Sequence, residues 1–405
     1  MTRYGRSPWL DTFPASRVPS YPKQRGALQA DAVIIGGGLT GCLTAYAFAA
    51  AGIEPVLLEA DRIGRGATAF SSGWISEEPG VAFGELEQTV GLRGARRVFQ
   101  SWRRGALDFA ALLRRLDIKC ALEERGTVSV AATPEQTLRM KKDHKARSAA
   151  GLAVPLLNAR AVRSEVHLDA AAGLRSRAGA TVDPYRATIG LAAAAASRGA
   201  SICERTPVSR IKFGRRNAQV FTPCGSIRTQ RIVVATGMPT PALFKALRRH
   251  FWFRTTYLVM TDAVPARVRK PIASRFVLRD SAEPAHVIQW AGDDRILVSG
   301  ADGETPPPRQ LDKMLVQRTG QLMYELSTLY PDISGLQAGY GWAAEYARTT
   351  EGIPYIGAHR NYPHHLFAFG DSSRSLTGAY LASRILLRQH SGELDPADAV
   401  FGFHR

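Results

Sequence analysis

Two short apolar runs separated by a small-residue segment form the most regular pattern in the chain. Residues 32–35 are continuously apolar, and a second apolar run at 56–58 ends at the acid Glu59. Between the runs lie glycines at positions 36, 37, 38 and 41, followed by small and apolar residues to about position 51. Apolar runs of this length indicate buried strands, and the small-residue segment indicates a helix. The pattern predicts a strand, a glycine turn, a helix, a second strand and a terminal acid.

This order of elements is typical of a dinucleotide-binding unit. Gly36 would allow the tight turn, Gly38 would let the backbone approach a pyrophosphate, and Gly41 would let the helix lie close to the sheet. The free N–H groups at the start of the helix attract phosphates. Glu59 can accept a hydrogen bond from a ribose 2′-hydroxyl and would repel a 2′-phosphate, which disfavours NADP. The residues expected to contact the nucleotide are Gly36, Gly38, Leu39, Thr40, Gly41, Glu59 and Ala60.

The loop at residues 64–73, GRGATAFSSG, is rich in Gly, Ser and Thr. Its backbone and hydroxyl donors could wrap a second phosphate and the ribityl chain of FAD, although an ordinary surface loop has a similar composition. Its position after the acid resembles the FAD-dependent D-amino acid oxidase (DAO) superfamily. The resemblance implies that Gly66, Ala67, Thr68, Ser71 and Ser72 contact FAD.

Later segments resemble the same superfamily in the same order. Residues 180–186 (ATVDPYR) are similar to its "VDP" segment, 206–208 to a strand that meets the adenine, and 231–237 to its "VVxATG" strand. Residues 342–357 are similar to "W…T-x-D-G-x-P-x-I-G", and 366–370 to its last strand. Through these matches the resemblance adds Val208, Ala235, Thr236, Gly237 and Gly357 to the expected FAD contacts. The nearest members are glycine and sarcosine oxidases and gamma-glutamylputrescine oxidase-like enzymes.

The resemblance implies an α/β fold in which two regions interleave along the chain. A Rossmann-like FAD-binding domain of the glutathione-reductase type would comprise residues 30–75, 175–240 and 339–405. An α+β substrate domain on a mixed or antiparallel sheet would comprise 76–174 and 241–338. Alternating segments at 257–260, 275–278, 286–290 and 295–298 predict the strands of that sheet. Residues 1–29 are Pro- and Arg-rich and are expected to form an extended arm.

Members of the superfamily oxidise a C–H bond next to an amine by hydride transfer to flavin N5. They usually hold the substrate carboxylate with Arg and Tyr, and the candidates here are Tyr346, Arg348, Tyr257 and Arg254. Some members attach FAD covalently through a His or a Cys. Phe70 and Ala344 stand near those places, so we expect non-covalent FAD.

A serine-containing segment, 370–377 (GDSSRSLT), departs from the pattern "GxGGxGxT" of the superfamily. The resemblance implies flavin contacts by Gly370, Ser373, Arg374, Ser375, Leu376 and Thr377. Serine adopts positive φ less readily than glycine. The loop could therefore lie differently, hold FAD more weakly, or place Arg374 as a charge near the flavin. Some amine oxidases also use a Lys near N5, and 295–300 contains none. The electron acceptor is accordingly either oxygen or a carrier.

The formal charge of +18 changes the range of candidate partners. The basic residues gather at 93–104 and at 139–147. They could attract an acidic substrate, nucleic acid or an anionic surface, and we favour a solvated basic face. No apolar run is long enough for a transmembrane helix, residues 1–9 contain no apolar signal region, and the four cysteines form no CxxC motif. We expect a cytoplasmic enzyme without a metal site.

The sequence therefore predicts an FAD-dependent oxidoreductase that acts on a small amine or amino acid. Two alternatives remain open. One is a tRNA-modifying flavoenzyme that acts on aminomethyl-uridine, which would suit the basic charge. The other is a degenerate FAD-binding protein without oxidase activity, which would suit the altered serine loop.

Overall fold

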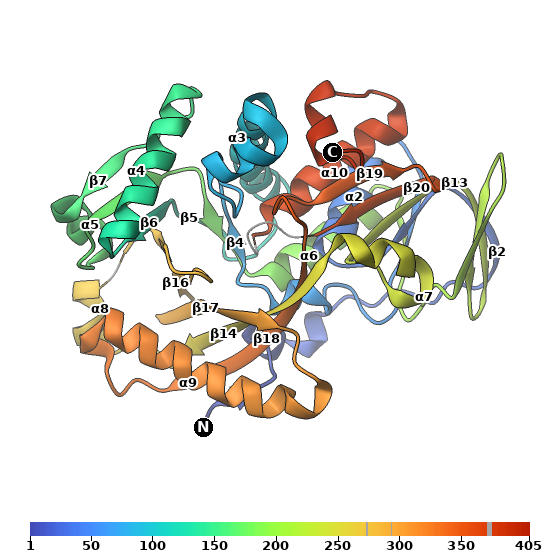
Figure 1. Cartoon of the computed structure of the whole chain (residues 1–405). Helices are drawn as coiled ribbons and strands as arrows, with labels where there is room; N and C mark the ends of the chain where they lie inside the picture. Colours follow the sequence, from blue (N-terminus) through green and yellow to red (C-terminus); the bar gives the residue numbers. More distant parts are fainter. Residues whose placement is uncertain (273, 293, 371–374) are drawn as a thin grey trace.

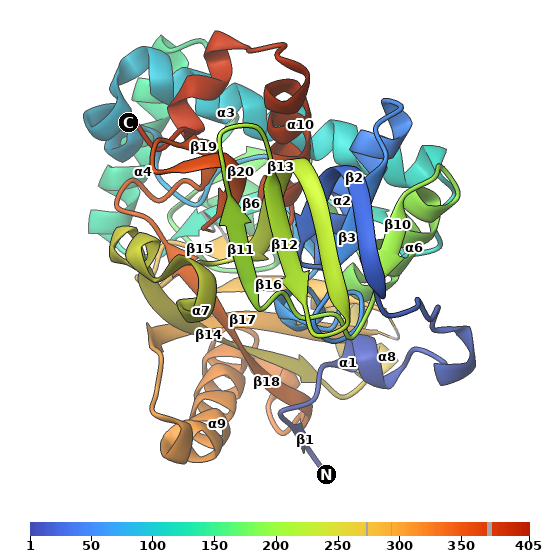
Figure 2. The ribbon, with the colours of Figure 1, turned by 90° about the vertical axis from the view of Figure 1, so that its right-hand side faces the viewer.

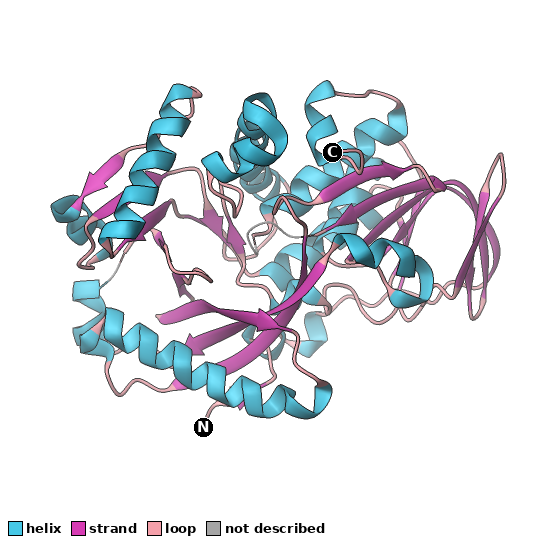
Figure 3. Cartoon of the chain, viewed as in Figure 1, coloured by secondary structure: helices cyan, strands magenta, loops and turns pink. Residues whose placement is uncertain are grey.

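The chain folds around two large sheets that it visits several times. The computed structural model describes residues 1–405 apart from 273, 293 and 371–374. One sheet lies on the right in Figure 1 and the other at the lower left, and Figure 3 distinguishes the helices from the strands of both. The mixed α/β architecture agrees with the predicted fold class.

The first sheet contains the predicted dinucleotide-binding unit. Its strand order is β10, β3, β2, β13, β12, β11, and β20 joins β13 to β19 (Figure 2). Its strands are β2 (Gly26–Ile35), β3 (Pro55–Leu58), β10 (Ser201–Cys203), β11 (Arg210–Phe213), β12 (Ala218–Thr222), β13 (Gly225–Gly237), β19 (Tyr355–His359) and β20 (Tyr362–Phe369). β10, β3, β2, β13 and β20 pair in parallel. Because these strands are parallel, their carboxyl ends lie along the same side of the sheet, so segments that are far apart in the sequence meet there, as in doubly wound nucleotide-binding sheets.

Helix α2 (Leu39–Ala50) packs between α6 (Pro184–Ala196) and α10 (Thr377–Ser391). Its small residues allow this close packing. A Cβ added at Gly41 would lie 1.8 Å from the carbonyl oxygen of Gly36. Gly36 itself has φ +107°, which favours glycine. The structure therefore agrees with the roles expected for these two glycines in the turn and in the helix packing.

The second sheet has nine strands in the order β1, β18, β14, β17, β16, β15, β6, β8, β7. These strands are β1 (Arg3–Tyr4), β6 (Thr127–Ala131), β7 (Leu156–Asn158), β8 (Ala172–Ser176), β14 (Trp252–Thr261), β15 (Val277–Asp280), β16 (Val287–Ala291), β17 (Arg295–Glu304) and β18 (Ala338–Arg348). Helix α9 (Leu311–Leu329) packs on β14, β17 and β18. A small third sheet consists of β4 (Trp74–Ile75), β9 (Ala180–Thr181) and β5 (Glu123–Glu124).

The remaining α-helices are α1 (Pro8–Asp11), α3 (Phe83–Arg115), α4 (Pro134–Ala149), α5 (Ala159–Val166), α7 (Pro241–Phe244) and α8 (Ala266–Ile272). Short 3-10 helices lie at Ala15–Arg17, Ala67–Phe70, Lys245–His250, Pro308–Gln310, Pro331–Ile333 and Pro396–Phe401. No helix within the described residues is both long and apolar enough to cross a bilayer.

Two predicted boundaries differ from the sheets. Residues 338–348 form β18 of the second sheet, although we expected 339 onward to belong to the FAD domain. The arm expected at 1–29 contributes β1 to the second sheet and also the first residues of β2. Both differences arise because long-range strand pairing, rather than a local pattern, decides which sheet a segment joins.

Helix α3 carries the first basic segment on its exposed side, as expected. On the opposite side of the helix Phe99, Trp102 and Phe109 are buried, whereas Leu92 is 53% exposed. The second basic segment differs at Arg147, which is only 4% exposed and pairs with Glu78 at 2.6 Å. Arg147 therefore belongs to a buried ion pair rather than to the solvated face.

Asp183 begins α6 and yields a pH-dependent prediction. Its carboxylate caps the helix by accepting a hydrogen bond from the Arg186 N–H at 2.9 Å. Burial raises the pKa of this carboxyl from 3.8 to about 6. Because the pKa of Asp183 is higher in the folded state than in the unfolded state, the protonated carboxyl group contributes to the stability of the fold at low pH. This contribution is lost as the pH rises through 6. Asp183→Asn should keep the cap without acquiring that charge.

The unfolding free energy of Asp183→Asn minus that of wild type should therefore be roughly 2–3 kcal/mol larger at pH 7 than at pH 4. Urea unfolding at the two pH values measures this difference. Asp395→Asn, at the exposed cap of the last 3-10 helix, controls for the loss of a capping carboxylate. An equal difference at both pH values would contradict the role of burial.

Candidate active site

Two adjacent cavities lie where the two sheets meet. We call the first, of about 190 Å³, the inner cavity; β14, β18, β20 and the starts of α2 and α10 line it together with residues 67–72. We call the second, of about 560 Å³, the outer cleft; it is lined by residues from α3, α4, β14, β18 and the 279–285 segment. Tyr346 lines both, so the two are neighbours.

Many of the expected FAD contacts meet in the inner cavity. They are Leu39, Thr40, Ala67, Thr68, Ser71, Ser72, Thr236, Gly237, Gly370, Ser375 and Leu376. These residues come from four separate stretches of the chain. Phe70 and Ala344, the positions related to covalent attachment in some members, line the same cavity. The structure thus brings together several of the segments that carried the family resemblance.

The glycine turn and Glu59 lie beside this cavity. Both carboxylate oxygens of Glu59 accept backbone hydrogen bonds, from Gly37 N–H at 2.6 Å and from Asp61 N–H at 2.8 Å. A carboxylate has further lone pairs available for hydroxyl donors. Gly37 therefore orients Glu59, a role that the sequence pattern did not predict. A Cβ at Gly37 would lie 2.9 Å from the Glu59 Cβ, so only glycine fits closely here.

The N-terminus of α2 has backbone donors but no side-chain cap. Its N-cap residue is Gly38, which has no side chain that could cap the helix. The Leu39 N–H donates to Thr68 Oγ1 at 3.0 Å. Gly38 has φ −76°, an ordinary value, so a side chain there would not strain the backbone. The absence of a side chain at Gly38 leaves space at the start of α2, and this space, not an unusual backbone conformation, is what glycine provides at this position.

Other expected contacts do not line the inner cavity. Gly66, Ala60 and Val208 lie outside its lining, and Ala235 packs against Gly36. Gly357 lies in β19 with the Gln389 side chain 2.5 Å from where its Cβ would be. Thr377 is fully buried and donates to the Ser76 carbonyl at 2.7 Å. Ser373 and Arg374 fall outside the described residues.

Ser375 shows how one serine of the altered loop is accommodated. Its hydroxyl accepts hydrogen bonds from the Ser76 N–H at 2.8 Å and from the Thr377 N–H at 3.3 Å. Ser375 is not among the described residues with positive φ. The hydroxyl ties the start of α10 to the end of β4, so the glycine of relatives is not needed at this position.

Tyr257 is misplaced in the predicted substrate set. It is 2% exposed and packs in a cluster with Leu315 and Leu322 of α9, and burial raises the pKa of its hydroxyl. Alternate residues of a strand face opposite sides. Arg254, Thr256 and Leu258 therefore face the cavities, and Tyr257 faces α9. The same period of two could have identified Thr256 and Leu258, which we missed.

The other three predicted substrate residues lie together at the outer cleft. Arg254, Tyr346 and Arg348 all line it, and Arg254 pairs with Tyr346 across β14 and β18. The Tyr346 hydroxyl donates to Asp302 Oδ2 at 2.6 Å. This bond fixes the direction of the tyrosine hydroxyl beside the cleft.

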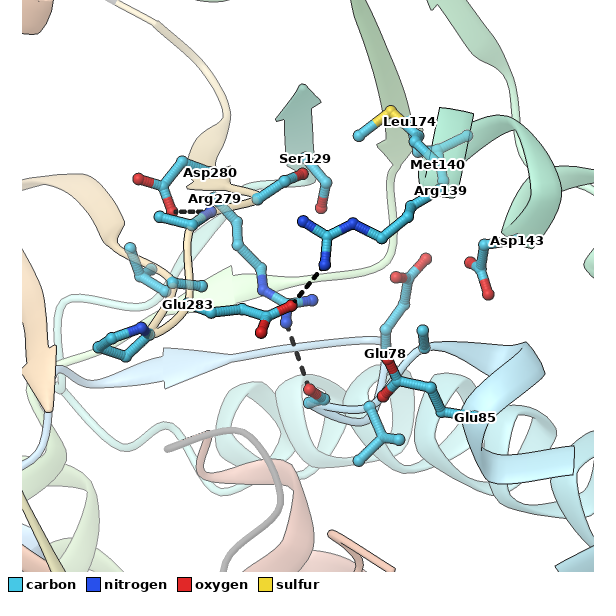
Figure 4. Close-up of a pocket in the computed structure, with 18 of the residues that line it drawn as sticks. Glu78, Glu85, Ser129, Arg139, Met140, Asp143, Leu174, Arg279, Asp280 and Glu283 are labelled. Carbon is cyan, nitrogen blue, oxygen red and sulfur yellow. Dashed lines mark hydrogen bonds and ion pairs between the residues drawn. The ribbon is translucent and has the colours of Figure 1, made fainter. Parts of the chain in front are cut away.

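Charged side chains of both signs line the outer cleft (Figure 4). The acids are Glu78, Glu85, Asp143, Asp280, Glu283 and Asp302, and the bases are Arg139, Arg147, Arg254, Arg279 and Arg348. The lining is thus close to neutral, although the chain carries +18. Burial raises the pKa of Asp143.

Several of these charges are held in place by neighbouring groups. Arg139 pairs with Glu283 at 2.8 Å, and Arg279 donates to the Gly80 carbonyl at 3.2 Å (Figure 4). Asp280 contacts His286 Nδ1 at 2.7 Å, and His286 Nε2 lies 3.0 Å from Glu325. These contacts hold the 279–286 segment beside the cleft.

Comparison with known proteins gives consistent matches. The family DAO, described as FAD dependent oxidoreductase, matches residues 31–389. Gamma-glutamylputrescine oxidoreductase of Escherichia coli (strain K12) is 24% identical over 391 residues, which cover 95% of this chain and 89% of that protein.

Two solved structures share the fold. Glycine oxidase from Geobacillus kaustophilus has a TM-score of 0.74 and 19% identity, covering 93% of this chain and 99% of its own. L-alpha-glycerophosphate oxidase from Mycoplasma pneumoniae with FAD bound has a TM-score of 0.71 and 16% identity, covering 90% and 95%. At these identities the likeness concerns the fold.

The residues present fit FAD. The start of α2, whose N-cap residue Gly38 has no side chain, supplies backbone donors, Glu59 supplies acceptors, and the inner cavity combines hydroxyl groups with apolar side chains. A dinucleotide with an aromatic ring needs these three kinds of partner.

Because Phe70 and Ala344 have no nucleophilic atom, FAD should leave the protein when the chain is precipitated with acid. Absorbance of the supernatant at the flavin band measures the release, and flavin left on the pellet would contradict it.

Gly38→Val should abolish FAD retention without unfolding the apoprotein. The nearest atom to a Cβ at Gly38 is Thr68 Oγ1 at 3.2 Å, so the end of the threonine side chain must shift by a few tenths of an ångström, and the valine occupies the approach to the helix start. We expect FAD affinity to fall at least about 100-fold, and Glu59→Gln to weaken it less because one acceptor oxygen remains. FAD titration of the apoprotein measures both.

Gly320→Val on α9, where a Cβ would meet nothing within 4 Å, is the control for adding a valine. Stoichiometric FAD in purified Gly38→Val would show that the phosphate site lies elsewhere.

Proposed function

Because the chain belongs to the DAO family of FAD-dependent oxidoreductases, we propose that it oxidises the C–N bond of an amino acid or a secondary amine. FAD, when bound, supplies the two-electron acceptor for the C–H bond next to the nitrogen. The observation that carries the proposal is that the inner cavity adjoins a charged cleft through Tyr346. Relatives named for gamma-glutamylputrescine and glycine support an amine substrate.

The arginines of β14 and β18 are suited to hold a carboxylate. Arg254 and Arg348 line the outer cleft near Tyr346, and a guanidinium binds a carboxylate through paired N–H donors. Tyr346, oriented by Asp302, adds a polar contact beside them. Together these side chains would orient a substrate so that its reacting carbon enters the inner cavity.

The opposite side of the cleft is suited to a cationic group. Glu78, Glu85 and Asp143 come from the segment before α3, from α3 and from α4. Arg147 already pairs with Glu78, whereas Glu85 is exposed to the cleft. A volume of about 560 Å³ accommodates a substrate considerably larger than glycine. An extended amine with charges at both ends would satisfy both sides.

The inner-cavity wall contributes shape more than charge. Thr256, Leu258 and Ser299 come from neighbouring strands of the second sheet, and Trp102 comes from α3. A largely apolar wall excludes water from a reacting C–H bond, and the few hydroxyl groups fix orientation. The product imine would be released to water, where it hydrolyses.

Anaerobic bleaching of the bound flavin across a panel of amino acids and secondary amines tests the reaction. We expect bleaching by at least one amine that bears a carboxylate, and re-oxidation by air or by an added dye decides between oxygen and a carrier. Arg348→Gln should raise the KM for that substrate about 10–100-fold, because it removes charge-assisted hydrogen bonds. FAD content should not change.

Arg309→Gln, at an exposed arginine of the 3-10 helix Pro308–Gln310, is the matched control. A panel in which no amine bleaches the flavin would favour a degenerate flavoprotein. An Arg348→Gln enzyme with an unaltered KM would remove that arginine from the substrate site.

A further inference from the structure

The loop beside the inner cavity is held by its carbonyl groups. Five consecutive carbonyls, from Ala69 to Gly73, each accept a hydrogen bond from a distant donor. The donors are the Ser7 hydroxyl to Ala69, the Trp342 indole to Phe70 (2.9 Å), the Trp9 indole to Ser71 (2.9 Å), the Gln289 amide to Ser72 (2.7 Å) and the Val182 N–H to Gly73 (2.9 Å). Two of the five donors belong to the N-terminal arm.

This loop forms one wall of the inner cavity, whereas the arm does not. Ala67, Thr68, Phe70, Ser71 and Ser72 all line the cavity, and neither Ser7 nor Trp9 is among the lining residues. Ser7 is 2% exposed, so its hydroxyl bond is shielded from water. The arm therefore has no direct contact with the cavity, and its hydrogen bonds to the cavity wall are made to this loop.

The direction of each carbonyl determines the polarity of that wall. A peptide unit has its N–H and C=O on opposite sides, so turning a peptide over exchanges a donor for an acceptor. Carbonyl oxygens that faced the cavity would repel the phosphates of a dinucleotide, whereas N–H groups and hydroxyls attract them. A carbonyl that accepts a buried hydrogen bond cannot turn over without losing that bond.

The arm is itself fixed to the second sheet. β1 pairs in parallel with β18 at Tyr340 and Gly341, and the Gly5 N–H donates to the Gly341 carbonyl at 2.8 Å. Asp11 accepts from the Tyr340 hydroxyl at 2.9 Å and pairs with Arg3; the tyrosine bond is the main cause of its lowered pKa. These contacts fix the arm on both sides of Ser7 and Trp9, and so they set the position of the two donors beside the loop.

We infer that residues 1–13 are part of the cofactor-binding apparatus. Ser7 and Trp9 act as positioning residues: they hold the carbonyls of Ala69 and Ser71 toward the arm, so that the loop keeps its donors available to FAD. The inference requires only that the chain binds FAD, and it stands even if the substrate is not an amine.

Trp9→Phe tests this directly because it keeps an aromatic ring and removes the indole N–H. We expect the dissociation constant for FAD, measured by quenching of flavin fluorescence on titrating the apoprotein, to rise about tenfold. Ser7→Ala should have an effect in the same direction, and the double variant a larger one. Trp252→Phe, at a tryptophan that is 53% exposed on β14, should leave the constant unchanged.

Urea unfolding of each apoprotein separates positioning from simple stabilisation. A purely structural bond would lower the midpoint of unfolding and leave the FAD constant of the folded protein unchanged, and this result would overturn the inference. Positioning raises the FAD constant whether or not the midpoint moves.

Hydrogen exchange provides a second readout that does not involve activity. Linkage requires that, if the docked arm favours FAD, then FAD favours the docked arm. FAD should therefore slow backbone exchange in peptides from residues 1–13 of the wild type, and Trp9→Phe should reduce this protection. Equal exchange of these peptides with and without FAD would refute the inference, as would unchanged FAD constants in Ser7→Ala and Trp9→Phe.

Discussion

The antiparallel pairing of β14 and β18 is the constraint on which the site depends. Leu258 lies opposite Trp342, Thr256 opposite Ala344 and Arg254 opposite Tyr346 along this pair. Leu258, Thr256 and Ala344 line the inner cavity, Arg254 lines the outer cleft, and Tyr346 lines both. A shift of either strand by one residue would turn its own member of this pair, Arg254 or Tyr346, to the α9 side of the sheet, since alternate side chains face opposite sides. The pairing of β14 with β18 thus fixes how the inner cavity and the outer cleft lie relative to each other.

The dinucleotide-binding unit could be predicted from the sequence because its signals are local. Glycines at fixed offsets, a small-residue helix and Glu59 all lie within about thirty residues, as the general fingerprint requires. The substrate residues were predicted less well, because the local alternation of β14 was not used to choose between Arg254 and Tyr257. The domain boundary at 339 failed for a different reason. Nothing local in residues 338–348 indicates that they pair with β14 and with β1.

The role of the arm illustrates what a sequence pattern does not contain. Ser7 and Trp9 are separated from the carbonyls that they hold by 62 positions in each case. Any exposed or buried Trp can donate a hydrogen bond, and backbone carbonyls carry no side-chain signature. The pairing of β1 with β18 and the packing of α1 on α6 and on the 67–70 helix bring these donors to the loop. The composition of the arm indicates an extended segment, and its contacts give that segment a specific place beside the cavity.

The charge of the chain and the charge of the cleft have different consequences. A net charge of +18 produces a field outside the protein that salt screens within about 8 Å, so it affects mainly the approach of a solute. Within the cleft, six carboxylates face five guanidinium groups at short range, where screening is weaker. A purely anionic ligand would meet as many unfavourable partners as favourable ones there. Discrimination among ligands therefore depends on where the individual acids and arginines lie within the cleft, which the overall basic composition does not determine.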